Sequence, residues 1–280
     1  MADPLRLMVV GAHPDDADYK AGGLAALYLE RGHEVLFISV TNGESGHHRI
    51  SGPELVERRR AEAAEAGRRA GLTYEVWDNP DGRLVADLPR REALIRSIRR
   101  FKPDLLLTHR PNDYHPDHRQ TSLMVQDAAY LLTVPPICPD VPHLRRDPVI
   151  AYLSDTFSRP YPFHPTVALD IGAAWDRKIS MLDAHVSQFY EWLPYNMRIE
   201  DSVPADAAAR RSGLEEWMRT GSLELAGRIR SKLVATYGPD RGASATLVEA
   251  FEGCEYGAPL DEPAIARLFP MLPTGDEVTR

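Results

Sequence analysis

A short apolar run near the N-terminus ends at a cluster of polar residues. Residues 5–10 are almost wholly apolar, which predicts a buried strand. Residues 11–18 follow at once, so that the imidazole of His13 and the carboxylates of Asp15 and Asp16 come where the strand ends. Ligand sites in α/β proteins gather at the carboxyl ends of strands. This feature therefore predicts an α/β fold with a site at the end of its first strand.

A second cluster of similar composition follows another apolar run. Residues 104–109 predict a strand, and residues 113–118 then supply His115, Asp117 and His118. Because the carboxyl ends of parallel strands meet at one edge of a sheet, we expect the two clusters to form a single divalent metal site.

Strands alternate with helices along most of the chain. We expect strands at 5–10, 33–41, 74–77, 104–109, 149–153 and 166–171, and helices at 21–31, 53–70, 88–101, 115–132 and 174–187. This alternation predicts a Rossmann-like, doubly wound, mostly parallel sheet flanked by helices. Beyond residue 201 it weakens into helices at 205–220 and 222–237 and an irregular tail. We therefore expect a main domain over residues 1–200 and a C-terminal extension packed on it over residues 201–280.

Two loops interrupt this pattern and are expected at the rim of the site. Residues 41–48 are too polar for the core, and residues 134–142 are broken by four prolines. Loops of this kind lie on the surface and often carry binding groups.

Charge and cysteine content narrow the classes of function. The net charge is −8, from 33 basic and 41 acidic residues, which disfavours nucleic acid as a partner. Cys138 and Cys254 are far apart, which fits a reducing compartment and provides no cysteine-based zinc site. The first four residues lack a basic region, and the following apolar run is too short for a signal peptide or a membrane span. We expect a cytoplasmic protein without a membrane partner.

The metal site needs three nitrogen or oxygen ligands and one open position for water. His13, Asp16 and His118 fit that number, and His13 and Asp16 are close enough in sequence for one tight turn to aim both at one point. Asp15 is then free to act as a general base on a water whose pKa zinc lowers to roughly 7.

The remaining polar residues of the second cluster suggest supporting roles. His115 lies three residues before His118, on the same side of a first helical turn. As an imidazolium it would stabilise an oxyanion or protonate a leaving amine. Asp117 would orient one of the rings from outside the ligand shell.

The motifs that carry these residues identify a family resemblance. Residues 12–16 read Ala-His-Pro-Asp-Asp and residues 115–118 read His-Pro-Asp-His, and further matches occur at 41–44, 59–62, 79–82 and 184–188. Over residues 5–190 the chain resembles the PIG-L/LmbE-like zinc-dependent N-acetylglucosaminyl deacetylases. One departure is Ala17, which stands where relatives usually have Glu.

The resemblance implies the same roles for the two clusters. It makes His13, Asp16 and His118 zinc ligands, Asp15 the general base, and His115 the electrostatic or acid partner, assisted by Asp117. It also implies substrate contacts from Arg59 and Asp81, and we expect further contacts from Asp18, one position after the altered Ala17, and from His185.

The function expected from these features is removal of an N-acetyl group from an amino sugar of GlcNAc type, or from its conjugate. Two alternatives remain open: an amidase of a larger thiol-sugar or other amide conjugate, and a non-catalytic sugar-binding or nucleotide-binding α/β protein. The first strand is not followed by Gly-x-Gly-x-x-Gly, which counts against nucleotides, and no Gly-x-Ser-x-Gly supports a serine hydrolase. Another divalent first-row metal could replace zinc. Relatives are often oligomers, so a homo-oligomer is expected.

Overall fold

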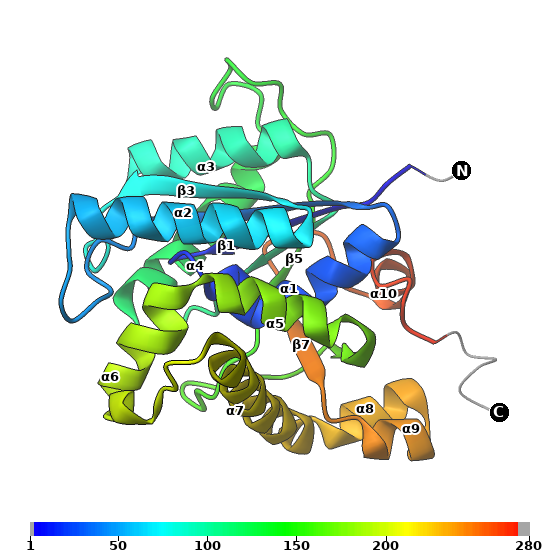
Figure 1. Cartoon of the computed structure of the whole chain (residues 1–280). Coiled ribbons are helices and arrows are strands. Elements are labelled where there is room, and N and C mark those ends of the chain that lie inside the picture. Colours follow the sequence, from blue (N-terminus) through cyan, green and yellow to red (C-terminus); the bar gives the residue numbers. More distant parts are fainter. Residues whose placement is uncertain (1–2, 274–280) are drawn as a thin grey trace.

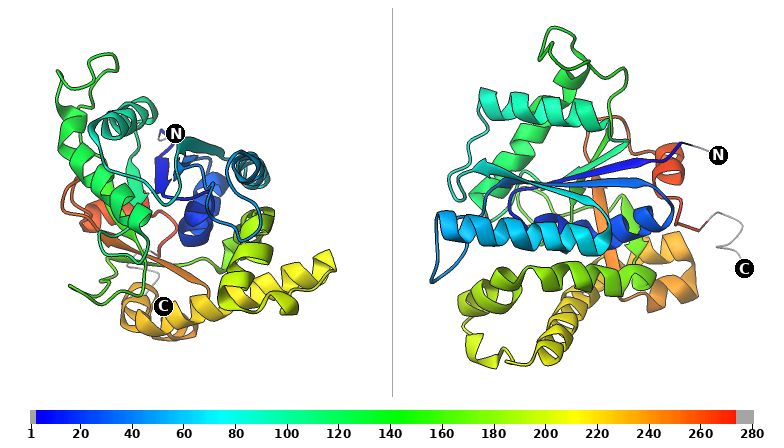
Figure 2. Two further views of the ribbon diagram at one scale, coloured as in Figure 1. Left: turned by 90° about the vertical axis from the view of Figure 1, so that its left-hand side faces the viewer. Right: turned by 45° about the horizontal axis from the view of Figure 1, so that its top comes forward.

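A seven-stranded sheet runs through the molecule and carries helices on both faces (Figures 1 and 2). The computed structural model describes residues 3–273, so the ends of the two expected regions, residues 1–2 and 274–280, lie outside the described residues. The strands are β1 (Arg6–Gly11), β2 (Glu34–Thr41), β3 (Thr73–Asn79), β4 (Leu105–Thr108), β5 (Val149–Leu153), β6 (Val167–Asp170) and β7 (Val248–Gly253).

Ten α-helices are found in the described chain. They are α1 (Asp16–Glu30), α2 (Pro53–Ala70), α3 (Leu88–Phe101), α4 (Pro116–Ala129), α5 (Trp175–Ala184), α6 (Leu193–Met197), α7 (Ala207–Arg228), α8 (Arg230–Tyr237), α9 (Pro239–Ser244) and α10 (Glu262–Leu268). Short 3-10 turns lie at η1 (Tyr130–Thr133), η2 (Gly172–Ala174) and η4 (Glu200–Ser202), and η3 (Ser187–Trp192) is a π-helix. None of the described helices is long and apolar enough to cross a membrane.

The strand order confirms the expected fold class. The sheet runs β3-β2-β1-β4-β5-β7-β6, and the first five strands of this order are parallel. Strands β2 and β3 lie on one side of β1, and β4 and β5 lie on its other side. The direction in which the chain adds strands therefore reverses between β1 and β4. Ligands of doubly wound sheets bind outside the carboxyl ends of the strands at such a switch point.

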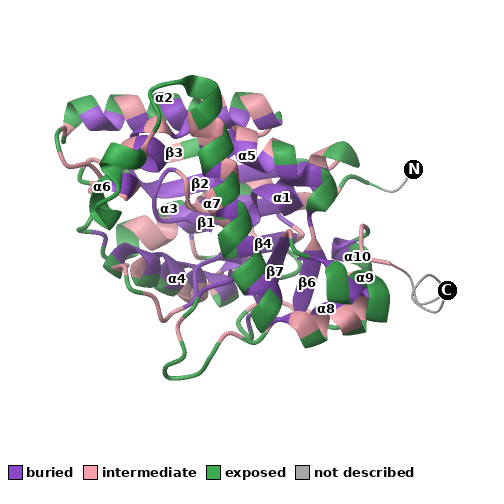
Figure 3. Cartoon of the chain, turned by 60° about the horizontal axis from the view of Figure 1, so that its bottom comes forward, coloured by how far each residue is buried: buried purple, intermediate pink, exposed green. Residues whose placement is uncertain are grey.

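Strand β1 shows why a continuous apolar run marks the centre of this sheet. Leu7 and Val9 pack in a core cluster with residues of α1 and α5, whereas Met8 and Val10 pack on the other face with residues of α3 and α4. All four side chains are fully buried, and Figure 3 shows the strands as the buried layer between the helices. Because side chains alternate between the faces, a strand covered on both sides must be apolar throughout.

The region beyond residue 201 is not simply an extension packed on a finished domain. Strand β7 lies inside the sheet, between β5 and β6, and runs antiparallel to both. Glu249 and Glu252 interrupt its apolar residues without the strict alternation of a half-buried strand, so the sequence pattern did not reveal it. Both glutamates are buried, and Lys178 and Arg110 lie against them at 2.7 and 3.3 Å. The expected division at residue 200 therefore does not separate two structural units.

Several helix boundaries also differ from expectation, and the ends of α4 and α5, at Ala129 and Ala184, come three residues earlier than expected. Helix α7 continues through residue 221 to Arg228, so the two helices expected in this region meet at a different place. Helix α1 begins at Asp16, five residues before the expected start at residue 21. The second half of the first polar cluster therefore forms the first turn of a helix.

The proline-rich loop at residues 134–142 does not lie at the rim of the site. Arg99 of α3 is buried beneath it and donates hydrogen bonds to six backbone carbonyls, those of Leu131, Leu132, Val134, Ile137, Cys138 and Val141. No residue of this loop lines the pockets that contain His13 or His118. Its polar backbone is satisfied by one buried guanidinium, so the loop is a structural element.

The contact between α1 and the loop after β6 leads to a stability prediction. A Cβ at Gly23 would lie 2.7 Å from the side chain of Ile171. Gly23→Ala should therefore destabilise the fold by about 1–3 kcal/mol through overpacking. Gly213→Ala in α7 is the matched control, because nothing lies within 4 Å of its Cβ. It should leave stability unchanged or raise it by up to about 1 kcal/mol. Urea unfolding measures both, and equal midpoints would contradict this packing.

Candidate metal centre

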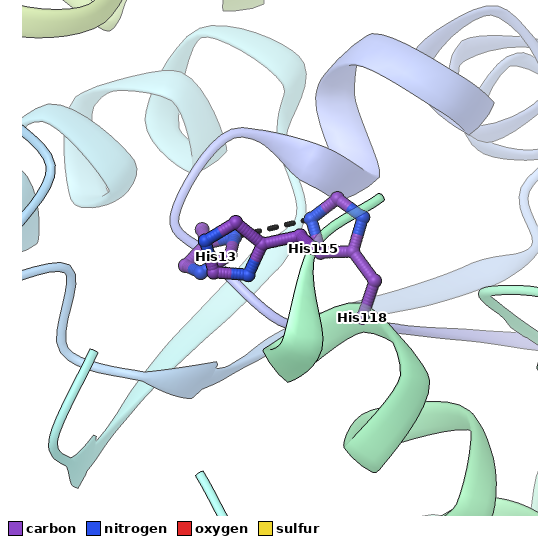
Figure 4. A group of neighbouring side chains, drawn as sticks. All are labelled: His13, His115 and His118. Atoms are coloured by element: carbon purple, nitrogen blue, oxygen red, sulfur yellow. Dashed lines mark hydrogen bonds between the residues drawn. The ribbon is translucent and has the colours of Figure 1, made fainter. Parts of the chain in front are cut away.

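The two polar clusters meet at the carboxyl ends of β1 and β4. His13 follows β1, and His118 lies in the first turn of α4, 105 residues further along the chain. The Nε2 atom of His118 lies 3.2 Å from the Nδ1 atom of His13. Figure 4 shows these two rings turned toward each other, with His115 beside them. The sequence-based expectation that the clusters converge is confirmed by this geometry.

The third proposed ligand, Asp16, reaches the same point from the first turn of α1. Its Oδ1 lies 3.5 Å from His118 Nε2, and its Oδ2 lies 3.5 Å from His13 Nδ1. Tetrahedral zinc, with bonds of about 2.0–2.1 Å, spaces its ligand atoms about 3.3 Å apart. Each pair among His13, Asp16 and His118 thus has the spacing of metal ligands, with a different oxygen of Asp16 facing each ring, and the assignment of these three residues as ligands of a divalent ion stays a proposal. His13, His115 and His118 also lie close enough together to hold a metal ion.

Carboxylates contact the outward-facing nitrogens of both rings. His13 Nε2 lies 3.2 Å from Asp81 Oδ1 and 3.3 Å from Asp117 Oδ2, and His118 Nδ1 lies 2.9 Å from Asp113 Oδ1. A ring N–H that donates to a carboxylate leaves the other ring nitrogen unprotonated and free to bind a metal. The geometry supports an orienting role for Asp117, whose contact with His13 Nε2 is a hydrogen bond. Asp81 and Asp113 lie at ion-pair distance from the same two rings.

The electrostatics of this cluster favour a cation. Burial lowers the pKa of His13, but its hydrogen bonds with Asp117, Asp16 and Asp81 outweigh burial and raise that pKa well above its usual value. For the carboxyl group of Asp81, burial by itself raises the pKa. The hydrogen bond with His13 outweighs burial and brings the pKa of Asp81 down to about 2. Several ionised carboxylates around one imidazole form a pocket of negative charge that a divalent ion would neutralise.

Asp15 is held in an unusual backbone conformation beside the proposed ligands. Its φ is 150°, a region that costs a residue other than glycine about 1–3 kcal/mol. Arg59 Nη2 donates to Asp15 Oδ1 at 3.2 Å and to the carbonyl of Pro14 at 2.9 Å, which holds the turn. Burial raises the pKa of Asp15 to about 6, against the opposing charge of Arg59. A carboxylate that titrates near neutral pH is suited to accept and release a proton.

The ring of His115 is oriented by the start of α4. Its Nδ1 accepts a hydrogen bond from the backbone N–H of Asp117 at 3.2 Å, so the neutral ring carries its proton on Nε2. Burial lowers the pKa of His115, and positive charge where His13 and His118 meet lowers it further. These forces favour a neutral N–H donor rather than the imidazolium expected from the sequence. A neutral donor is still able to stabilise an oxyanion.

Sequence reasoning missed His109, which closes the cluster from the end of β4. Its Nε2 lies 3.2 Å from Asp16 Oδ2 and accepts a hydrogen bond from the backbone N–H of Ala12 at 3.1 Å. Its ring stacks on that of His118 at 4.0 Å, and burial lowers the pKa of His109 to about 4. Asp16, His109 and His118 also form a group with metal-ligand spacing, but the Ala12 bond occupies the His109 nitrogen. Its position directly after an apolar strand was the signal that could have revealed it.

Two of the expected substrate contacts lie beneath the site. Asp18 and His185 are fully buried, and His185 Nε2 lies 3.1 Å from Asp18 Oδ2. Direct contact with a substrate does not fit this burial. The pair instead links the first turn of α1 to the end of α5.

Two pockets open from the cluster, and both include Asp15, Asp16, Tyr114 and Leu193 in their walls. The first, which we call the polar chamber, has a volume of about 250 Å³ and is also lined by His13, Ser45, Gly46, Arg59, Asp81, Gly82, His115, Gln188, Trp192 and Asn196. The second, the aromatic chamber, has a volume of about 330 Å³ and is also lined by Tyr19, Lys20, Asp113, His118, Asp155, Thr156, Phe157, Phe189, Trp217 and Met218. Arg59 and Asp81, both expected to contact substrate, line the polar chamber.

The carboxylates outside the proposed ligand set generate a prediction about metal affinity. Asp117→Asn should weaken binding of a divalent ion about 10–100-fold, because the amide orients His13 less firmly than the carboxylate does. Competition with a chromophoric chelator measures this affinity. His143→Ala, in the loop after α4, is the control and should bind the ion as the unaltered protein does. Equal affinity in both variants would contradict the orienting role of Asp117.

Comparison with known protein families gives one match along the first half of the chain. Residues 8–129, which include both polar clusters, match the family model described as GlcNAc-PI de-N-acetylase (PIG-L).

Individual relatives differ in the reactions that their names describe. The chain is 26% identical over 196 residues to 4-oxalmesaconate hydratase from Pseudomonas putida. The aligned region covers 67% of this chain and 76% of the hydratase. It is 34% identical over 148 residues to mycothiol S-conjugate amidase from Streptomyces coelicolor, covering 43% of this chain and half (50%) of the amidase. Among solved structures, N,N'-diacetylchitobiose deacetylase from Pyrococcus horikoshii superposes with a TM-score of 0.69 at 22% identity, over 91% of this chain and 85% of that one. This last likeness establishes a shared fold.

Proposed function

Because this chain contains a PIG-L family domain, we propose that it is a metal-dependent hydrolase that cleaves the amide of an N-acylated amino sugar. The N-acetyl sugar of GlcNAc type, free or as a conjugate, is the simplest substrate of this class. The observation that carries the proposal is the convergence of His13, Asp16 and His118 beside the carboxylate of Asp15. An amide hydrolase needs this combination of a Lewis acid and a base.

The proposed ligand atoms are His13 Nδ1, Asp16 Oδ1 and His118 Nε2. This set of nitrogen and oxygen ligands is typical of zinc sites, and another divalent first-row ion could bind to the same ligands. When bound, the ion polarises the amide carbonyl and lowers the pKa of a water molecule.

The protein's own groups would perform the proton transfers. Asp15, which lies beside the proposed ligands in the wall of both pockets, takes a proton from the attacking water. His115 Nε2–H donates toward the oxygen that becomes negative as the carbonyl carbon turns tetrahedral. The proton on Asp15 then passes to the leaving nitrogen, so that a carboxylic acid and a free amine are released.

The polar chamber is the proposed sugar site. Arg59 and Asp81 face it with opposite charges, and Gln188 and Asn196 add amide groups. Sugar hydroxyls removed from water need hydrogen-bond partners, and this wall provides both donors and acceptors. Trp192 provides an apolar surface for the face of a sugar ring.

A hydratase is the second candidate function, favoured by the similarity to 4-oxalmesaconate hydratase over most of that protein's length. Water activated beside Asp15 would then add to a carbon–carbon double bond, and no amine would be released. Loss of ultraviolet absorption by a conjugated unsaturated acid identifies this reaction, and appearance of a primary amine identifies the hydrolase.

A cytoplasmic location and a homo-oligomer stay predictions from the sequence.

The role of Asp15 as base leads to the central test of the hydrolase. Asp15→Asn should lower amine release from N-acetylglucosamine conjugates about 10²–10⁴-fold and leave the bound metal in place, because Asn keeps the shape but accepts no proton. Fluorogenic detection of the amine measures turnover, and elemental analysis measures the metal.

The control for this variant is Asp147→Asn, an exposed aspartate before β5. It should keep full activity. Full activity in Asp15→Asn would contradict the assigned base, and amine release that persists after a chelator has removed all divalent ions would contradict the metal-dependent mechanism.

A further inference from the structure

The aromatic chamber is larger than an acetyl group requires. Its volume is about 330 Å³, whereas a cavity of about 150 Å³ is already large enough to bind benzene. The methyl of an acetyl group would therefore leave most of the chamber unfilled. A further cavity of about 150 Å³ adjoins the same two side chains of α7, Trp217 and Met218.

The arrangement of the two chambers indicates which part of a substrate each one takes. Both share Asp15 and Asp16, so the reacting carbonyl lies where they join. One side of an amide carries the amine and the other carries the acyl group. The sugar amine belongs in the polar chamber, because its hydroxyls would lose their hydrogen bonds against aromatic walls. The acyl group then extends into the aromatic chamber.

The walls of the aromatic chamber are suited to an uncharged apolar chain. Phe157, Phe189, Trp217 and Met218 come from four places that the fold brings together: the loop after β5, the π-helix η3 and two positions of α7. Of the four acids in its wall, Asp15 and Asp16 lie where the two chambers join. Asp155 is paired with the guanidinium of Arg110 at 2.7 Å, and Asp113 with the ring of His118 at 2.9 Å.

The basic group of this chamber is also engaged. The Nζ atom of Lys20 donates to the carbonyl of Ser154 at 2.9 Å and lies 4.8 Å from the centre of the Tyr19 ring. The chamber therefore presents mainly aromatic and thioether surface to whatever enters it. Such surface gains free energy by burying methylene groups or an aromatic ring.

We propose that the preferred substrate of this chain carries an N-acyl group longer than acetyl, whose apolar part binds in the aromatic chamber against Phe157, Trp217 and Met218. This inference rests on the proposed amide hydrolysis and defines the acyl side of its substrate. It makes the aromatic chamber the determinant of acyl length, with the sugar held in the other chamber.

Binding and turnover of a graded series test the proposal. The probes are glucosamines with N-acetyl, N-butyryl, N-hexanoyl and N-phenylacetyl groups. In the metal-loaded Asp15→Asn variant, calorimetry should show the Kd falling by up to about fourfold for each added methylene. In the unaltered enzyme, kcat/KM should rise at least about tenfold from acetyl to hexanoyl.

Substitutions in α7 locate the effect in the chamber. Met218→Trp fills the chamber and should lower the hexanoyl-to-acetyl ratio of kcat/KM at least about tenfold, because added volume excludes the longer chain. Leu223→Trp is the matched control: Leu223 is exposed on the same helix and outside the chamber, so its ratio should not change. Phe157→Ala, in the loop after β5, is a second variant that removes chamber wall without adding volume, and it should also lower the ratio.

The outcomes separate this inference from the proposed function. Equal or falling kcat/KM and affinity along the acyl series, with acetyl still cleaved, would overturn the inference and leave the hydrolase intact. Release of no amine from any of these amides would contradict the hydrolase itself, and weak binding of all the amides would then overturn the acyl assignment as well.

Discussion

The site depends on the parallel pairing of β1 with β4. Leu7 to Val10 lie opposite Leu105 to Thr108 in register, and Thr108 Oγ1 donates to the carbonyl of Val10. Because both strands run in the same direction, the residues that follow them emerge at the same edge of the sheet. Two segments about a hundred residues apart thereby place imidazoles within 3.2 Å of each other. Each cluster alone contributes an incomplete ligand set, and the strand pairing makes one site of them.

The C-terminal region holds this arrangement from behind. The Glu249 carboxylate of β7 accepts hydrogen bonds from the backbone N–H groups of Gly23 and Leu24 in α1, and Lys178 donates to the same carboxylate and to the carbonyl of Tyr19. A buried ion pair is tolerated only when its remaining hydrogen-bonding capacity is met, as it is here. These bonds tie β7 to the helix whose first turn carries Asp16. The same region supplies Trp217 and Met218 to the aromatic chamber, so it contributes to the site as well as to the sheet.

Within the candidate site, the residues that sequence reasoning identified best are those next to strand ends. Asp15 and Asp16 followed an apolar run and were recognised by that position, and the rule applied equally to His109, which was overlooked. Burial was harder to foresee. Asp18 was expected to contact the substrate, yet it faces inward and pairs with His185, because α1 begins at Asp16 and its first turn directs residue 18 toward α5. The preference of His115 for its neutral form likewise depends on neighbours that no local pattern reveals.

The sequence by itself determined the local elements: the apolar run of β1, helices α2 and α3 with their expected bounds, and the spacing of ligand types within each cluster. Such features depend on neighbours a few residues away, so periodicity and turn chemistry express them directly. Only the tertiary structure decided that β7 lies between β5 and β6, that Glu249 and Glu252 are buried with partners, and that two chambers of different character meet at Asp15. Those outcomes depend on contacts between distant segments, whose free energy exists only when the whole sheet and its helices pack together.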